Sequence, residues 1–140
     1  MDTQTIPDSE SNVIAFTDGS CTGNGKASSR GGVGVHFASF RDMFQDISDP
    51  LDDSQFKATN QRAELKAILL AVTSWSASEA KDRRLIIYSD SQYGINTCQT
   101  WMYNWFKRGE TKMNWDIVTA LYGAIQPIRD SISFVHVRGH

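Results

Sequence analysis

The sequence is poor in the residues and runs that mark several classes of protein. Its 140 residues include only 2 Cys and 3 Pro, and its longest aliphatic run spans residues 67–72, whereas a membrane span needs about 20 apolar residues. Cys21 and Cys98 can form neither a disulfide framework nor a four-cysteine zinc site. The first ten residues lack the basic-then-apolar order of a signal peptide. We therefore expect an intracellular protein, cytoplasmic or nuclear, with no membrane segment.

Neither sign of charge is in large excess. Lys and Arg number 14 and Asp and Glu number 16, for a net charge of −2 and a pI near 5.9. This balance counts mildly against broad, charge-driven binding of nucleic acids, although a local basic patch can still hold phosphates. A hydrophobic fraction of 40% is enough to bury the core of one domain. Residues 1–11 are polar and aperiodic, which predicts a disordered arm before a single domain over residues 12–140.

Short apolar runs and helical periodicity predict a mixed α/β domain. Strands are expected at residues 13–17, 33–38, 43–48, 85–89 and 131–137, with a turn at 18–20 and a polar linker at 49–54. Helices are expected from Asn60 as the N-cap, between residues 95 and 105, and from Asn114. The order is then β-β-β-α-β-α-α-β. A helix crosses between the first and fourth strands, so these two strands should be parallel neighbours.

Three acids are predicted to meet at one edge of this sheet. Asp18 and Asp90 each follow a short apolar strand, and Glu64 lies one turn before Ile68 in the crossover helix. Crowded carboxylates repel one another unless they are protonated or neutralised by a cation, and oxygen-only ligation favours magnesium or manganese over zinc. Taken singly, each acid is more simply a turn former, a helix cap or a partner of the helix dipole. The expected convergence of all three favours a site.

Four segments resemble, in order and spacing, the motifs of type 1 ribonuclease H. They are FTDGS at 16–20, TNQRAEL at 59–65, YSDSQY at 88–93 and VHVRGH at 135–140, of which TNQRAEL is the most specific. ISDPL at 47–51 favours the eukaryotic-type catalytic domain. The resemblance implies a ribonuclease H-like fold, with helices flanking a five-stranded mixed sheet. It also implies endonucleolytic cleavage of the RNA strand of RNA–DNA hybrids with two Mg²⁺ ions, for which Mn²⁺ can substitute.

The resemblance assigns catalytic roles residue by residue. It implies that Asp18, Glu64 and Asp90 are metal ligands, and that His140 is the mobile histidine that assists proton transfer or product release. The family's fourth acidic ligand lies about ten residues beyond the Gly-His pair, on a C-terminal helix without a counterpart here. We therefore expect a domain that is C-terminally incomplete and impaired in activity. The alternatives are a catalytically inactive hybrid-binding remnant, and a nuclease of this fold acting on single-stranded or branched DNA, which TNQRAE disfavours.

Substrate contacts carry over by the same motifs. The residues implied to bind the hybrid are Asn24, Asn60 and Gln61 in the minor groove, Lys57, Thr59 and Asn114 at a DNA phosphate, and Trp101 and Trp105 along the DNA strand. Lys107, Arg108 and Lys112 correspond to a short version of the family's basic loop. Simpler interpretations are a turn residue for Asn24, a helix cap for Asn60 and a core position for Trp105, while His36 and His136 are expected to be ordinary strand residues. No obligate protein partner is implied.

Overall fold

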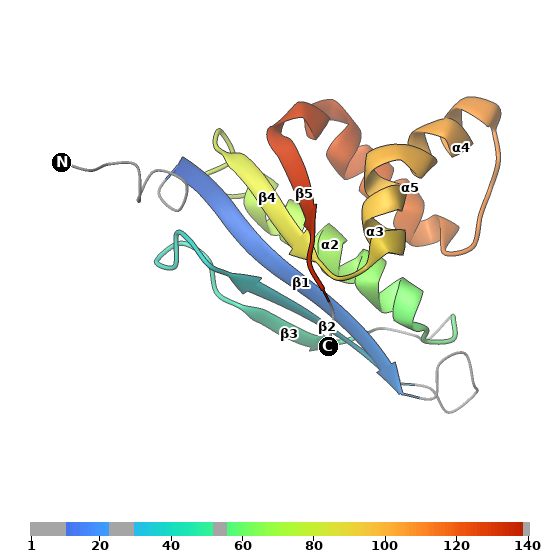
Figure 1. Cartoon of the computed structure of the whole chain (residues 1–140), viewed down its shortest axis with the longest axis horizontal. Helices are drawn as coiled ribbons and strands as arrows, with labels where there is room; N and C mark the ends of the chain where they lie inside the picture. Colours follow the sequence, from blue (N-terminus) through green and yellow to red (C-terminus); the bar gives the residue numbers. More distant parts are fainter. Residues whose placement is uncertain (1–10, 23–29, 52–55, 139–140) are drawn as a thin grey trace.

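Five strands form one mixed sheet in the computed structural model of the chain, which describes residues 11–22, 30–51 and 56–138. The strand order is β3-β2-β1-β4-β5, with β3 and β5 at the two edges (Figure 1). Their bounds are β1 Asn12–Thr22, β2 Arg30–Phe37, β3 Ile47–Pro50, β4 Arg84–Ser89 and β5 Ile132–His136. β1 pairs with β2 and β2 with β3 in antiparallel fashion, whereas β1 with β4 and β4 with β5 are parallel. The predicted parallel pairing of the first and fourth strands is confirmed.

Helices connect and cover these strands. Their bounds are α2 Asn60–Ser76, α3 Gln92–Asn96, the π-helical turn η1 Thr97–Trp101, α4 Met102–Arg108, α5 Trp115–Ile125 and the 3-10 segment η2 Gln126–Ser131. α2 crosses from β3 to β4, packs against β1 and β2, and contacts α5. The predicted element order is therefore confirmed, with the second helix divided by a π-helical turn. No helix in the described ranges combines the length and the apolar character that a membrane crossing requires.

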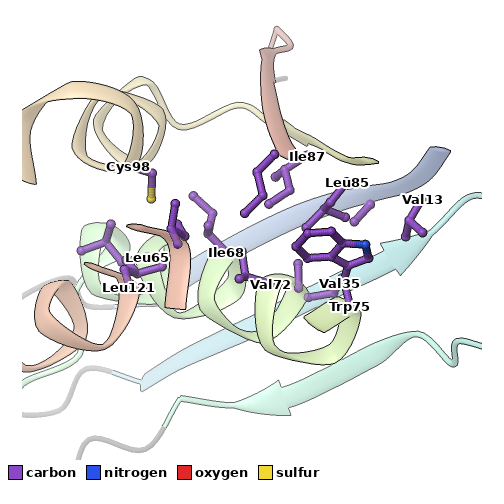
Figure 2. Close-up of a cluster of buried hydrophobic side chains, with 14 of the residues drawn as sticks. Val13, Val35, Leu65, Ile68, Val72, Trp75, Leu85, Ile87, Cys98 and Leu121 are labelled. Carbon is purple, nitrogen blue, oxygen red and sulfur yellow. The ribbon is translucent and has the colours of Figure 1, made fainter. Parts of the chain in front are cut away.

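The core lies between α2 and the sheet. Figure 2 shows Ile68, Val72 and Trp75 of α2 on the side of the helix that faces Val13 and Leu85 of the strands. All five are at most 1% exposed. Along β1, burial alternates as in a strand with one covered face, and Phe16 on the other face is 41% exposed. Packing of α2 on β1 thus fixes which residues at the end of β1 lie beneath the helix.

The end of β1 differs from the prediction. The turn expected at Asp18-Gly19-Ser20 is wrong, because β1 continues through these residues and pairs Asp18 with Gly34. The glycine-rich β2 segment pairs with β1 along its whole length and so keeps residues 18–20 in a strand. The local sequence of residues 18–20 alone does not reveal this pairing. Asp18 therefore lies within a paired strand rather than in a loop.

The third strand is also shifted along the chain. It was expected at residues 43–48 but begins at Ile47 and extends to Pro50, which pairs with Gly32. A turn precedes it, in which Phe40 has a φ of 53° and accepts a hydrogen bond from the Met43 N–H. Pro50 is tolerated because β3 is an edge strand. The arm expected at residues 1–11 lies, except for Ser11, outside the described residues, and the domain division remains a prediction.

Candidate active site

Two of the three predicted acids stand side by side at one end of the parallel strand pair. Thr17 of β1 is in register with Ser89 of β4, and Asp18 and Asp90 are the next residues along each strand. β5 extends this edge, because the Val137 N–H donates to the Ser89 carbonyl at 2.9 Å. The carboxyl ends of neighbouring parallel strands are the usual place for a ligand site in an α/β sheet.

Gly19 brings the third acid to this edge. A Cβ on Gly19 would lie 2.3 Å from the Ala63 carbonyl carbon and 2.4 Å from the Glu64 nitrogen, both of which belong to the backbone of α2. Real Cβ atoms do not come so close, so α2 can approach β1 here only because residue 19 has no side chain. The close approach positions Glu64 beside the strand residue that follows Asp18.

The charges of the three acids act on one another. Burial raises the pKa of the Glu64 carboxyl above its usual range, and the charges of Asp90 and Asp18 raise it further. The Ser91 hydroxyl, which donates to Glu64 Oε1 at 2.8 Å, lowers this pKa in part. The three carboxyl groups therefore share one electrostatic environment, as expected for a site that binds a cation.

The donor chemistry fits a hard divalent cation, since the candidate ligands supply only carboxylate oxygens. In the part of the chain that the structure describes, no three His, Cys, Asp or Glu side chains are gathered closely enough to hold a metal ion as they stand. Asp18, Glu64 and Asp90 are thus neighbours within electrostatic range rather than a closed ligand cluster. Their roles as ligands remain predictions.

The first turn of α2 presents the predicted recognition residues. Thr59, rather than Asn60, is the N-cap: its backbone is extended and its hydroxyl oxygen accepts a hydrogen bond from the Arg62 N–H at 3.1 Å. Lys57, Asn60 and Gln61 are exposed. Asn60 and Gln61 precede Glu64 by about one turn of α2, so the exposed amides lie at the same end of this helix as Glu64.

A buried arginine that the sequence analysis missed connects α2 to the start of α5. Arg62 is 5% exposed and donates to both Asp116 oxygens, at 2.9 and 2.5 Å. It also donates to Asn114 Oδ1 at 3.4 Å, and its guanidinium lies 4.3 Å from the centroid of the Phe56 ring. The Asn114 backbone is left-handed, with a φ of 64°. Arg62 thereby holds Asn114 next to the first turn of α2, where the predicted phosphate pocket requires it.

This ion pair yields a pH-dependent stability prediction. The hydrogen bonds from Arg62 hold the pKa of the Asp116 carboxyl below its usual range. Asp116→Asn should lower the free energy of unfolding by about 2 kcal/mol at pH 7, measured by urea denaturation, because a charged hydrogen-bond partner is lost. A carboxylate with a lowered folded-state pKa stabilises the fold above its unfolded-state pKa, about 4, and loses that effect as the pH falls through the folded-state value.

The difference between parent and variant should therefore shrink below about pH 4. Asp130→Asn provides a control, because Asp130 is exposed on η2. An Asp116→Asn variant whose destabilisation is the same at pH 3 and pH 7 would contradict the assignment.

The two tryptophans of the predicted DNA-strand contact differ in exposure. Trp101 is 38% exposed, while Trp105 is partly buried and packs against the core. Their ring centroids are 6.1 Å apart, and Lys112 Nζ lies 5.9 Å from the Trp105 ring. Trp101 is accordingly the better placed of the two for stacking on a sugar, as the sequence suggested.

Two predicted site residues lie outside the described residues, while two other histidines lie within them. Asn24 and His140, both predicted site residues, are not among the described residues. His136 was expected to be an ordinary strand residue, yet its Nε2 lies 3.3 Å from the Asp90 carbonyl oxygen at the acidic edge. His36, also on a strand, has its Nδ1 2.8 Å from Asp46 Oδ2. Only the pairing of β4 with β5 places His136 near the acids, so the local sequence carried no signal of it.

Comparison with known proteins identifies the family. The RNase H family model matches residues 10–140. The chain is 36% identical over 135 residues to ribonuclease H of Haemophilus influenzae (strain 86-028NP), covering 91% of this chain and 78% of that protein. It is 30% identical over 132 residues to ribonuclease H1 of Rattus norvegicus, covering 91% of this chain but only 44% of that protein. The chain therefore spans less than half of the rat relative.

Solved structures show the same fold. The PFV RNase H domain matches with a TM-score of 0.69 at 20% identity, covering 91% of this chain and 79% of that one. LC11-RNase H1, solved in complex with RNA/DNA hybrid, matches with a TM-score of 0.65 at 17% identity, covering 90% of this chain and 85% of that one. Together with the strand order and the match over residues 10–140, these similarities show that the chain belongs to the RNase H family.

Proposed function

We propose that this protein hydrolyses the RNA strand of RNA–DNA hybrids in a reaction that depends on divalent metal ions. The observation that carries the proposal is that Asp18 and Asp90 follow paired residues at the carboxyl end of the β1–β4 pair, close enough to Glu64 for their charges to raise its pKa. Beside them, the first turn of α2 presents exposed Asn60 and Gln61. Acids that bind cations next to side chains that can read a nucleic acid are the two parts that such a nuclease needs.

The three carboxylates are the residues that would hold the ions. Ribonucleases H are generally dependent on divalent metals, and oxygen-only ligands favour Mg²⁺, with Mn²⁺ as a substitute. Bound ions supply activation of an attacking water and neutralise charge on the leaving 3′-oxygen. Glu64 and the two aspartates would contribute by fixing negative charge at the carboxyl ends of β1 and β4, against which the start of α2 packs closely.

Recognition of the hybrid would come from the surface around the start of α2. Asn60 and Gln61 are suited to the minor groove, where the 2′-hydroxyls distinguish RNA from DNA. Lys57, Thr59 and Asn114 are proposed to hold a DNA phosphate. The Thr59 hydroxyl accepts from Arg62 and can still donate its own proton. Lys57 stands where the family often has arginine, so this contact would be a point charge rather than a bidentate fork.

Two substitutions test this recognition. Asn60→Ala should weaken binding to the hybrid by about tenfold without weakening binding to double-stranded DNA, because it removes one groove contact worth about 1–2 kcal/mol. Lys57→Ala should weaken both and reduce the salt dependence of binding by roughly one phosphate contact. Fluorescence anisotropy in Ca²⁺ at several salt concentrations measures both effects. Equal loss of affinity for hybrid and DNA in Asn60→Ala would reject the groove assignment.

The reaction itself is tested with a panel of labelled duplexes. Hybrid, double-stranded RNA and double-stranded DNA of one sequence are incubated with the protein, with Mg²⁺ and with EDTA. Cleavage of the RNA strand of the hybrid in Mg²⁺ alone is the expected result. Cleavage of double-stranded DNA at a similar rate would reject the proposed substrate.

A second candidate function is binding of hybrids without turnover. It is favoured by the finding that no three ligand-type side chains in the described ranges form a closed metal site. This candidate predicts that the chain binds hybrid more tightly than double-stranded DNA but leaves the RNA strand intact at millimolar Mg²⁺. The same panel, with a binding measurement beside it, separates the two functions.

A further inference from the structure

We infer that Ser91 is a positioning residue that holds the Glu64 carboxylate in the acidic site, an inference that rests on the proposed function. Ser91 follows Asp90 directly and is 5% exposed. Its Oγ donates a hydrogen bond to Glu64 Oε1 at 2.8 Å. The bond connects the N-cap of α3 to α2. This hydrogen bond joins the side chain of Glu64 to a side chain outside its own helix.

The direction of the Ser91 hydroxyl is fixed by its other contacts. Its oxygen accepts from the Gly94 N–H at 2.9 Å, which caps α3, and the Ser91 N–H donates to Ser89 Oγ at 3.0 Å. A serine hydroxyl has one proton to donate. One lone pair of Oγ accepts from Gly94, and the hydroxyl proton is donated to the Glu64 carboxylate, an acceptor that lies 2.8 Å away. The bond is therefore built into the start of α3 and is not an incidental surface contact.

Close packing of α3 on α2 supports this arrangement. A Cβ on Gly94 would lie 2.9 Å from Ile68 Cδ1 and 3.2 Å from Ser91 Oγ. Ile68 is one turn beyond Glu64 on the same helix. The start of α3 therefore packs closely on α2 at the level where Ser91 reaches Glu64.

A carboxylate that is held in place should bind a cation more tightly at this site than one that is free to rotate. Glu64 is repelled by the charges of Asp18 and Asp90, so without a donor its side chain would gain by rotating away from them. Groups that orient metal-binding side chains through hydrogen bonds typically change metal affinity by about 10–100-fold when removed. We assign Ser91 this role because it is the donor to an acid held between two like charges.

The test compares three variants. Ser91→Ala removes the donor, Ser91→Thr retains a hydroxyl and an N-cap, and Ser39→Ala is the matched control. Ser39 is also 5% exposed and makes an equivalent pair of hydrogen bonds, donating to the Asn12 carbonyl at 2.8 Å and accepting from the Ile14 N–H at 2.9 Å, at the opposite end of β1. Measured quantities are the Mn²⁺ concentration that half-saturates the rise in melting temperature and the Mg²⁺ concentration that half-saturates hybrid cleavage.

Ser91→Ala is expected to raise both concentrations by about 10–100-fold, and Ser91→Thr to stay within about threefold of the parent. Ser39→Ala should lose thermal stability without a change in either concentration. Unchanged half-saturation in Ser91→Ala, or an equal change in Ser39→Ala, would overturn the inference. So would the lack of any Mn²⁺-induced rise in the parent chain.

Failure of the proposed function gives a different pattern. A chain that binds Mn²⁺ in a Ser91-dependent manner but leaves the hybrid intact would support the positioning role and reject the proposed reaction. Cleavage of the hybrid with the same metal dependence in the parent and in Ser91→Ala would reject only the positioning role.

Discussion

Replacement of Asp18 by asparagine is expected to lower the single-turnover rate of hybrid cleavage by about a thousandfold or more. The substitution preserves the size of the side chain but removes a negative charge from the shared environment of the three acids. The loss of a cation ligand removes several kcal/mol of transition-state stabilisation, and each 1.4 kcal/mol corresponds to about tenfold in rate. The expected result is measured as single-turnover cleavage of a labelled hybrid in Mg²⁺.

The fold of this variant should be intact, because Asp18 is exposed and its backbone pairing with Gly34 does not depend on the side chain. Asp82→Asn is the matched control, since Asp82 is an exposed acid in the turn before β4. It should leave the rate close to that of the parent, because Asp82 precedes β4 whereas Asp90 follows it, at the opposite end of the strand. A rate in Asp18→Asn of about a tenth or more of the parent rate would contradict the role of this carboxylate as a cation ligand.

Gly19→Ala is expected to have the largest effect on stability. The new Cβ would lie 2.3 Å from the Ala63 carbonyl carbon, and this contact is with backbone, which cannot rotate away. Either β1 or α2 must move, and overpacking of this kind costs about 3 kcal/mol or more. Because the same contact positions Glu64, the variant should also lose hybrid cleavage under conditions where it is still folded.

Gly123→Ala is the matched control for this prediction. Gly123 lies within α5, and a Cβ there has open space around it, with no atom within 4 Å apart from its chain neighbours and the nearby backbone of its own helix. The same substitution should therefore stabilise the protein, by up to about 1 kcal/mol, through the better helix propensity of alanine. Urea denaturation of both variants gives the comparison. A Gly19→Ala protein as stable as the parent would show that α2 does not depend on close approach to β1.

The topology was predictable because it follows from local patterns and a general rule. The helix between residues 60 and 76 lies between the first and fourth strands in the sequence, and such a crossover makes these two strands parallel neighbours, which brings Asp18 and Asp90 together. The extent of β1 was not predictable in this way. Asp18-Gly19-Ser20 has the composition of a turn, and only pairing with the glycine-rich β2 makes it a strand.

The supporting residues of the site were missed for a related reason. Ser91 and Glu64 are 27 residues apart, and Arg62 and Asp116 are 54 apart, so neither contact leaves a local pattern. Within TNQRAEL, Arg62 occurs among positions that become buried, and a buried charged residue is a sign of a partner of opposite charge. That sign does not reveal which acid the partner is. The structure supplies Asp116.

The most direct measurement of metal-dependent hydrolysis is the chemistry of the ends produced from the RNA strand of a hybrid. The protein is incubated with a hybrid of defined sequence over a range of Mg²⁺ concentrations, and the RNA fragments are analysed by mass spectrometry. A water attacking at a site formed by Asp18, Glu64 and Asp90 should yield 5′-phosphate and 3′-hydroxyl ends, and only when Mg²⁺ is present. Fragments ending in a 2′,3′-cyclic phosphate, or cleavage that persists in EDTA, would contradict it.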